Sequence, residues 1–175
     1  PLNPNSLYGA SKAAQELVAR SYWHTDKLPV VITRSSTLYG VGMRMTQVVS
    51  IFLKQAVMNE PITVHGNGKQ TRDLNFVSNL VDGLALALVS PKAVGEIFNL
   101  AGGNEVSVNQ IAEAAVLYTR SKSTIAHIEQ REGEEGVRLV PDITKANKVL
   151  GYSPKISFEQ GMERTAQWMR EQRLW

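Results

Sequence analysis

Tyr8 and Lys12 are the residues whose types and spacing best suit acid–base chemistry. They stand four positions apart, a separation that puts two side chains on the same face of a helix. A lysine ammonium close to a phenol favours the phenolate and so lowers the pKa of a tyrosine. Such a tyrosine can exchange a proton with a substrate hydroxyl or keto oxygen near neutral pH. On its own the pair is a weak signal, because a surface tyrosine packed on a lysine stem has the same spacing.

The elements that must position these side chains alternate between helix and strand. Residues 6–27 have apolar residues at helical spacing and begin with Ser6, a favoured N-cap residue. Residues 30–35 are a β-branched run between turn residues, which is typical of a buried strand. The same patterns predict helices at 46–59, 79–90 (capped by Ser78), 108–120, 143–150 and 157–172, strands at 62–65, 73–77, 96–100 and 124–129, and loops at 37–45 and 130–138. Strands that alternate with helices favour an α/β fold.

Length and composition limit the classes of protein that fit. The 175 residues suffice for one domain or two small lobes, and 43% hydrophobic with 20% charged residues is typical of a globular chain. The absence of cysteine excludes disulfides and thiolate metal sites. A net charge of +3 without a block of basic residues gives no indication of nucleic-acid binding. No apolar run approaches the roughly 18 residues that cross a bilayer, and residues 1–6 do not resemble a signal peptide, so we expect a cytoplasmic protein without membrane contact.

The segment from Pro4 to Glu16 carries a family resemblance. Its pattern, Pro-x-Ser-x-Tyr-Gly-x-Ser-Lys-x-x-x-Glu, closely resembles the active-site helix of the extended short-chain dehydrogenases/reductases. The resemblance implies that Tyr8 is the general acid/base and that Lys12 also holds the ribose of a nicotinamide cofactor. Both residues are therefore expected to be catalytic and to bind the cofactor.

A second motif, Arg-Ser-Ser-Thr-Leu-Tyr-Gly at residues 34–40, resembles the Arg-x-x-Asn-x-Tyr-Gly segment of that family. Family members use this segment to contact the nicotinamide and the diphosphate of the substrate. The resemblance implies cofactor contacts for Ser35 and Thr37, and a substrate contact for Thr37. Thr37 stands where asparagine is usual, so it keeps a hydroxyl but offers no amide to the phosphate.

A third motif, at residues 64–79, strongly resembles the family signature Gly-Asp/Asn-Gly-x-Gln-x-Arg-Asp-Phe-x-x-Val-x-Asp. It implies that Arg72 clamps the phosphate of the nucleotide, in line with the bidentate fit of a guanidinium to phosphate oxygens. Asp73 is expected to brace the loop rather than touch the ligand, and Asn79 replaces the usual acid. His65 has a position that is commonly aromatic and near the base in relatives, so we expect a nucleotide contact there and no metal site.

A fourth motif begins at Arg131. Residues 131–154 resemble the family's Arg-Pro-Gly-Glu…Asp…Ser-Lys-Ala…Leu-Gly-Trp-x-Pro tail, which implies that Arg131 is a second contact to the nucleotide diphosphate. Glu132 replaces the proline, and Glu134 and Glu135 add negative charge that opposes anion binding. The alternative for this stretch is a solvated charged loop.

The motifs run from Pro4 to the last helix but match only the second part of the family pattern. No Gly-x-x-Gly-x-x-Gly follows a strand near the N-terminus, and the family's catalytic Ser/Thr lies upstream of its tyrosine. The resemblance therefore implies a partial, truncated Rossmann-type α/β sheet with a small C-terminal substrate-binding lobe. We expect residues 1–60 and 78–101 to be a remnant of the dinucleotide-binding fold, and residues 61–77 and 102–175 to form the lobe.

Two hypotheses about function follow. The resemblance implies the C-terminal portion of an NAD- or NADP-dependent nucleotide-sugar epimerase or dehydratase, not redox-competent alone, whose ligand is a nucleotide-diphosphate sugar. The alternative is a stand-alone truncated protein that assembles with itself, with or without binding a nucleotide sugar, and does no catalysis. The sequence leaves open the sugar, the nucleotide, NAD against NADP, and epimerase against dehydratase.

The same resemblance bears on assembly. In the family, the strand at 30–35 pairs with a preceding strand that this sequence does not contain, and an exposed apolar edge invites pairing with another chain. The helix that bears the tyrosine is also a dimer helix in relatives. We therefore expect a homodimer or a higher homo-oligomer.

Overall fold

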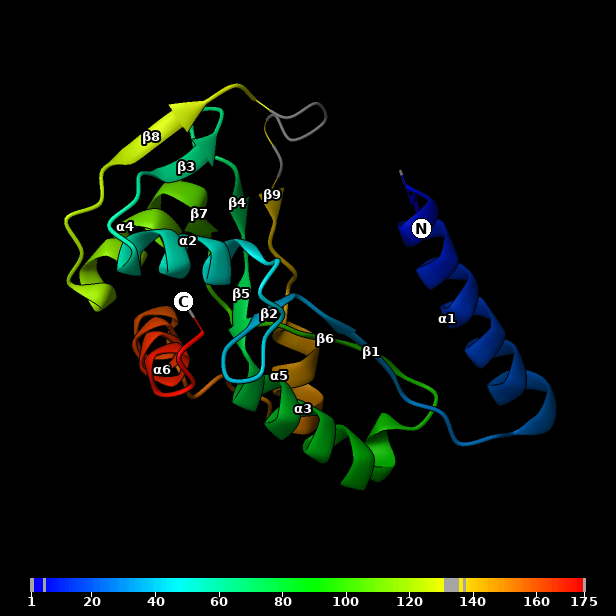
Figure 1. The fold of residues 1–175 in the computed structure, drawn as a ribbon. Coiled ribbons are helices and arrows are strands. Elements are labelled where there is room, and N and C mark those ends of the chain that lie inside the picture. Colours follow the sequence, from blue (N-terminus) through cyan, green and yellow to red (C-terminus); the bar gives the residue numbers. More distant parts are fainter. Residues whose placement is uncertain (1, 5, 131–135, 137, 175) are drawn as a thin grey trace.

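Short strands alternate with helices along the chain. The structure, a computed structural model, describes residues 2–4, 6–130, 136 and 138–174 (Figure 1). The helices are α1 (Leu7–Asp26), α2 (Val48–Val57), α3 (Val77–Val89), α4 (Val108–Thr119), α5 (Thr144–Leu150) and α6 (Phe158–Glu171), with a 3₁₀ turn, η1 (Pro91–Ala93). The strands are β1 (Ile32–Ser35), β2 (Thr37–Tyr39), β3 (Ile62–His65), β4 (Thr71–Arg72), β5 (Leu74–Phe76), β6 (Ile97–Leu100), β7 (Val106–Ser107), β8 (Ile125–Ile128) and β9 (Arg138–Leu139). Among the described helices, none combines the length and the apolar character needed to span a membrane.

Parallel pairing dominates the sheets. β1 pairs with β6 from Ile32↔Ile97 to Ser35↔Leu100, and β2 pairs with β5 and β3 with β8 in the same sense. Within the described ranges, antiparallel pairing is confined to β4 and β7 in the small sheet β7–β4–β9. Parallel neighbours need a crossover connection, which helices commonly supply. The predicted α/β class is therefore confirmed.

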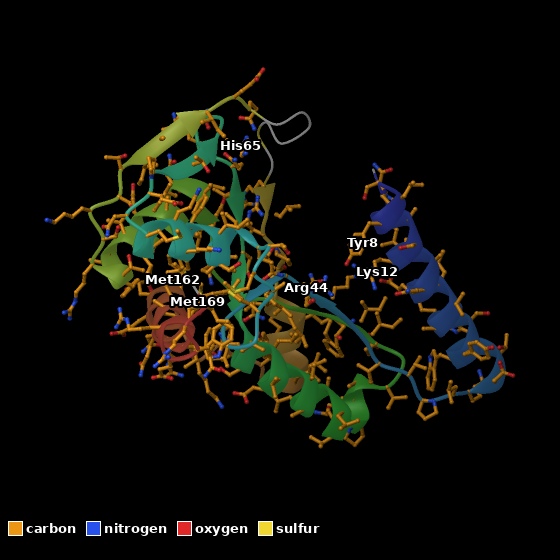
Figure 2. All side chains as sticks on the ribbon, viewed as in Figure 1. Tyr8, Lys12, Arg44, His65, Met162 and Met169 are labelled. Carbon is orange, nitrogen blue, oxygen red and sulfur yellow. The ribbon has the colours of Figure 1, made fainter. Side chains whose placement is uncertain are left out.

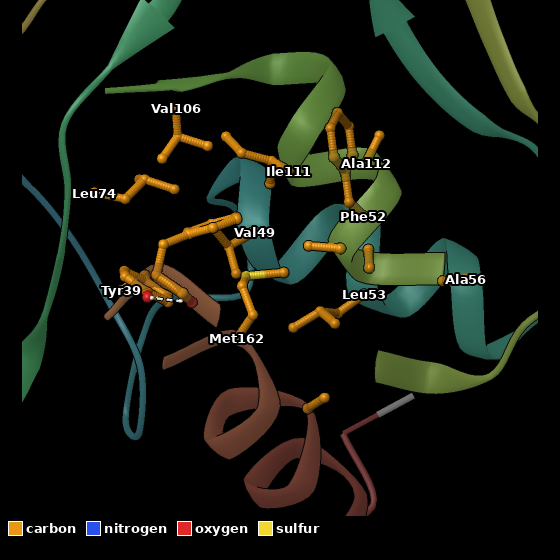
Figure 3. Packing of buried hydrophobic residues seen from close by; sticks show 14 of the residues in the cluster. Tyr39, Val49, Phe52, Leu53, Ala56, Leu74, Val106, Ile111, Ala112 and Met162 are labelled. Atoms are coloured by element: carbon orange, nitrogen blue, oxygen red, sulfur yellow. Dashed lines mark hydrogen bonds between the residues drawn. The ribbon is translucent and has the colours of Figure 1, made fainter. Parts of the chain in front are cut away.

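Two hydrophobic clusters hold these elements together. The larger lies between α2, α4, α6 and β3, where Leu53 and Met162 are fully buried (Figure 3). The smaller joins α3 and α5 to β6 around Phe98. Tyr39 ends β2 inside the larger cluster, and its hydroxyl donates a hydrogen bond of 3.0 Å to the carbonyl oxygen of Phe158. Burial raises the pKa of Tyr39, so its hydroxyl remains a protonated donor that ties β2 to α6.

Serine side chains begin three of the helices. Ser6 starts α1 as predicted, since its Oγ accepts a hydrogen bond of 3.1 Å from the N–H of Gly9. Ser107 and Ser157 start α4 and α6, each in a capping box with a glutamine three positions on. These side chains satisfy N–H groups that the first turn of a helix leaves without a partner.

Three details of the predicted elements are wrong. The stretch Thr37–Tyr39, predicted as loop, forms β2, because its β-branched and apolar residues pair with β5, far along the chain. The predicted strand at 73–77 is the shorter β5, and a separate strand that was not predicted, β4, precedes it, with Asp73 between the two. Helix α3 then follows β5 directly with Phe76 in the N-cap position, so Ser78 lies inside the helix and does not cap it.

Helix α1 stands apart from the rest of the molecule (Figure 1). Its single buried residue is Glu16, whose two carboxylate oxygens accept hydrogen bonds of 2.8 and 2.6 Å from the guanidinium of Arg34 in β1. Near its C-terminal end, the indole of Trp23 packs against Gly95, where a Cβ would lie 2.6 Å from the indole nitrogen. Several apolar residues along the helix stay exposed to solvent, namely Leu7, Leu17, Val18 and Tyr22.

The ion pair between Glu16 and Arg34 makes the position of α1 sensitive to acid. The hydrogen bonds from Arg34 hold the pKa of Glu16 below its ordinary value of 4.5, against the opposing effect of burial. A carboxyl group with a lowered folded-state pKa stabilises the fold above its unfolded-state pKa, and this contribution is lost as the pH falls through the folded-state pKa. We therefore expect α1 to loosen from β1 as the pH falls below 4.5.

Tryptophan fluorescence during an acid titration measures this loosening. With Trp168 and Trp175 replaced by phenylalanine, the signal comes from Trp23 and reports whether its indole leaves Gly95. The Glu16→Gln variant has a side chain of similar shape but no titrating charge, so it should lack the transition. A transition of the same size in that variant would show that another group is responsible.

Candidate functional site

Tyr8 and Lys12 lie on one face of the first turns of α1, as their spacing predicts. The ammonium of Lys12 lies 5.7 Å from the centroid of the Tyr8 ring and donates a hydrogen bond of 3.2 Å to Oε1 of Gln15. Tyr8 is 73% exposed. Figure 2 shows both side chains on the side of α1 that faces the rest of the molecule. The pair can therefore meet a ligand that lies between α1 and β1.

A groove of about 720 Å³ separates α1 from β1. Tyr8 and Lys12 line it from the helix, and the strand lines it from Val31 to Ser35. The ion pair of α1 with β1 lies in the same groove and raises the pKa of the guanidinium of Arg34, which stays charged. The groove thus gathers the predicted acid–base pair and Ser35, one of the predicted cofactor contacts.

A second pocket, of about 300 Å³, brings together the three described residues that the motifs assign to the substrate. Thr37 begins β2, His65 ends β3 and Arg72 ends β4, so three separate strands deliver them. The Nε of Arg72 is buried and has no hydrogen-bond partner among the described residues. A buried N–H without an acceptor is unfavourable, and a phosphate oxygen is the acceptor that a guanidinium binds best.

The ring of His65 is fixed by a backbone contact. Its Nδ1 lies 3.0 Å from the carbonyl oxygen of Glu129, in the segment that follows β8. Because a carbonyl oxygen can only accept, Nδ1 must carry the proton, and Nε2 is left for another partner. The imidazole therefore offers an aromatic face and one further ring nitrogen to the pocket that it lines. Figure 2 labels His65, at the end of β3.

Gln47, which belongs to none of the four motifs, also lines this pocket. It has the N-cap position of α2 but makes no side-chain capping bond. Its Oε1 is buried and has no partner in the described part of the chain. The sequence predicts a helix from residue 46 onward, so it gives no sign that Gln47 stands at the start of α2 and lines this pocket.

Two further polar residues of the third motif support the structure. Asp73 is fully buried and accepts a hydrogen bond of 2.5 Å from Oγ of Ser36, and it lines neither the groove nor the pocket, so the predicted bracing role is confirmed. Asn79 is also buried, and its Oδ1 accepts hydrogen bonds of 3.0 Å from the N–H groups of Lys155 and Ile156. The amide that replaces the family's acid thus holds the segment before α6.

The groove and the pocket are separate hollows. Ser35 lines the groove and Thr37 lines the pocket, with Ser36 between them in the chain. Tyr8 is therefore not in the pocket that contains Arg72. Arg131, the second predicted phosphate contact, lies outside the described residues.

The described residues fit one end of a nicotinamide dinucleotide. Lys12 and Tyr8 offer an ammonium and a hydroxyl along an open groove, and these groups can bind ribose hydroxyls. A pyrophosphate, by contrast, is typically held by free N–H groups at the start of a helix or in a glycine-rich turn. The starts of α1, α4 and α6 are occupied by their own serines, Ser6, Ser107 and Ser157. The starts of α2, α3 and α5 have no side-chain capping bond at the N-cap position, and the start of α2 lies at the pocket that contains Arg72.

The chain is similar to proteins of one known family. The family model described as GDP-mannose 4,6 dehydratase matches residues 1–165. The chain is 32% identical over 176 residues to the dTDP-D-glucose 4,6-dehydratase of Homo sapiens, in a match that covers 98% of this chain and 50% of that protein.

Solved structures show the same likeness. An epimerase from Methanothermobacter thermautotrophicus superimposes with a TM-score of 0.93 at 29% identity, covering 99% of this chain and 53% of the other. The UDP-glucuronic acid 4-epimerase from Bacillus cereus, in complex with UDP-glucuronic acid and NAD, superimposes with a TM-score of 0.89 at 29% identity, covering 97% and 54%.

The likeness confirms the predicted partial Rossmann-type fold, since the chain spans about half the length of the relatives it matches. The family model extends over almost the entire sequence, and the four motifs occur in the family's order. The chain therefore belongs to the nucleotide-sugar epimerase/dehydratase group of the extended short-chain dehydrogenase/reductase family.

Proposed function

We propose that the chain is the C-terminal, substrate-binding portion of an NAD- or NADP-dependent nucleotide-sugar epimerase or dehydratase. The observation that carries the proposal is the pocket of about 300 Å³ that gathers Thr37, His65 and Arg72 from three strands. Its volume is at the lower end of sites for small molecules. The Homo sapiens and Bacillus cereus relatives bear the two activities in their names, and the second is bound to UDP-glucuronic acid and NAD.

The pocket is the proposed site for a nucleoside diphosphate. Arg72 binds the diphosphate, because its buried Nε requires an acceptor and its guanidinium is planar and charged. His65 contacts the base through its ring and its free nitrogen. Thr37 adds a hydroxyl at the edge near the groove, and Arg131 is proposed as a second phosphate contact.

The groove is the proposed place of the acid–base chemistry. Tyr8 exchanges a proton with a hydroxyl or keto oxygen of the sugar, and the Lys12 ammonium stabilises negative charge on the phenol oxygen. Tyr8, Lys12 and Ser35, which line the groove, also hold the nicotinamide end of the cofactor, together with Thr37. The nicotinamide, when bound, supplies the hydride acceptor.

We further propose that these 175 residues bind the nucleotide sugar but do no redox chemistry alone. In support, the sequence has no Gly-x-x-Gly-x-x-Gly after a strand. Under this proposal, residues 1–60 and 78–101 are the remnant of the dinucleotide-binding fold. Residues 61–77 and 102–175 form the substrate-binding lobe.

Thermal unfolding in the presence of single ligands tests the proposal. A ligand that binds the folded state raises its apparent stability by mass action. We expect UDP, dTDP or their sugars to raise Tm, and NAD or NADP to leave it unchanged. Strong stabilisation by NAD would contradict the lack of redox competence, and no response to any nucleoside diphosphate would contradict the assignment of the pocket.

A specific feature favours self-assembly as a second candidate. The N–H of Ile32 donates to the carbonyl of Glu96 and that of Ser36 to the carbonyl of Leu100, so even-numbered residues of β1 bond to β6. The backbone groups of Thr33 therefore point to the groove, where the described chain supplies no strand. An open strand edge can pair with a strand of another chain, and the exposed apolar face of α1 beside it can pack against that chain.

We propose that a second copy of the chain covers this edge, in a homodimer or higher homo-oligomer. We also propose that the protein is cytoplasmic, because a chain without cysteine suits a reducing compartment. Light scattering measures the mass of the particle in solution. A monodisperse monomer would rule out the oligomer, whereas the nucleotide site would stand.

A further inference from the structure

The junction between β1 and β2 connects the groove to the pocket through one residue. Ser35 lines the groove, Thr37 lines the pocket, and Ser36 between them donates a hydrogen bond of 2.5 Å from Oγ to Oδ1 of Asp73. Asp73 in turn follows Arg72 in the chain. The bond between Ser36 and Asp73 therefore joins the two segments that bear Thr37 and Arg72.

Asp73 is a node for several distant segments. Its Oδ1 also accepts a hydrogen bond of 2.7 Å from the N–H of Gly102, and its Oδ2 accepts one of 3.0 Å from the N–H of Asn104. Its own N–H donates to the carbonyl of Leu139 in β9 at 2.8 Å. A carboxylate without exposure to water is costly unless donors satisfy it, and here a serine and two backbone groups do so. The junction β1–β2, the break β4–β5, the segment after β6 and β9 thus converge on one residue.

The loop that supplies two of these donors is shaped to approach β5. A Cβ at position 102 would lie 2.5 Å from the carbonyl oxygen of Leu74, so the approach needs Gly102. The amide of Asn104 accepts from the N–H of Leu74 at 3.2 Å and donates to its carbonyl at 2.9 Å. It therefore acts as a neighbouring strand would for the first residue of β5. These contacts fix the chain break at Asp73, immediately beyond Arg72.

We infer that Ser36 and Asp73 are positioning residues of the proposed nucleotide site. Their hydrogen bond holds the start of β2 against the end of β4, and so sets the separation between Thr37 and Arg72, which must reach one ligand together. Neither residue lines the pocket, so each acts through its neighbour in the chain. A displacement of about 1 Å in a preorganised site is enough to reduce its function strongly. The inference rests on the proposed function, since it concerns the same pocket.

The affinity of the full chain for UDP, measured by calorimetry, tests the inference. Ser36→Ala removes the hydroxyl, and we expect about tenfold weaker binding, because the contact that holds Thr37 and Arg72 at their separation is lost. Ser36→Thr keeps a hydroxyl and should restore most of the affinity. Thr165→Val is the matched control, because the buried hydroxyl of Thr165 bonds to the carbonyl of Gly161 within α6, away from the pocket. This control should lose stability and keep its affinity for UDP.

A combination with a substitution at Arg72 tests whether Ser36 acts through Arg72. In an Arg72→Lys background, Ser36→Ala should weaken binding less than it does in the wild type, because it acts through the position of Arg72. Fully additive losses, or wild-type affinity in Ser36→Ala, would overturn the positioning role while the nucleotide site stands. If Ser36→Ala does not fold, Ser36→Cys, with its weaker donor, should bind with intermediate affinity, and wild-type affinity there would overturn the role equally.

A readout without ligand separates this inference from the proposed function. If the wild type does not bind UDP, the proposed function fails, and the NMR signal of the Arg72 Nε–H then tests the positioning alone. That signal should move in Ser36→Ala and return in Ser36→Thr. An identical signal in all three proteins would overturn the positioning role.

Discussion

Replacement of Arg72 by alanine should weaken the binding of UDP or dTDP about a hundredfold. The guanidinium has a buried Nε without an acceptor among the described residues, so a bound phosphate would gain a hydrogen bond at a nitrogen that water does not reach. Two hydrogen bonds to a charged group, at about 1.5 kcal/mol each, amount to about 3 kcal/mol, which corresponds to roughly two factors of ten. Calorimetry with UDP on the purified chain measures the effect.

Two variants show whether the loss is specific. Arg72→Lys keeps the charge but not the planar fork, so we expect an intermediate affinity. Arg138→Ala removes an arginine whose guanidinium pairs with Glu105 at 2.9 and 2.7 Å on the surface, outside the pocket. It should bind UDP as the wild type does. An equal loss in Arg138→Ala would mean that net charge, and not the pocket, governs binding.

Replacement of Asp73 by alanine should lower the free energy of unfolding by about 3 kcal/mol or more. The change leaves the hydroxyl of Ser36 and the N–H groups of Gly102 and Asn104 without their acceptor in a fully buried place. Each buried donor left without a partner costs about 1 to 3 kcal/mol, less where the hydroxyl can turn to another acceptor. Urea unfolding, analysed with the linear dependence on denaturant, gives the difference.

Asp82→Ala is the control for this prediction. Asp82 is a surface residue of α3 whose carboxylate pairs with the ammonium of Lys155 at 2.9 Å. Exposed ion pairs contribute about 0 to 1 kcal/mol, so this variant should remain close to the wild type. Similar losses in both variants would contradict the role of Asp73 as the node of the fold.

Local patterns in the sequence predict much of the fold. Ser6 begins α1 where a cap was predicted, the strand expected at 62–65 is β3, and Gly151 ends α5 in the left-handed conformation. Such features depend on residues within one turn of each other. β2 was missed because its partner, β5, lies more than thirty residues away, so the pairing of Thr37 with Leu74 leaves no local sign.

The candidate site also combines features that the sequence predicts with features that depend on contacts between distant residues. The motif order predicts that Arg72, His65 and Thr37 serve one ligand, and the structure places them in one pocket. The division of the site into a groove and a pocket was not predictable, because it depends on how far α1 stands from β1. The three donors around Asp73 are equally invisible in the sequence, since all of them come from at least 29 residues away.

The attachment of α1 has a consequence for how the acid–base pair is assembled. In the described structure the helix is held mainly by the Glu16–Arg34 ion pair and by Trp23, while most of its apolar face is in water. Such an element is expected to open locally with a free energy well below that of global unfolding. Tyr8 and Lys12 therefore lie on a segment that is expected to open more easily than the rest of the described structure. A ligand or a chain that binds in the groove will also order α1. Binding in the groove therefore brings Tyr8 and Lys12 into fixed positions.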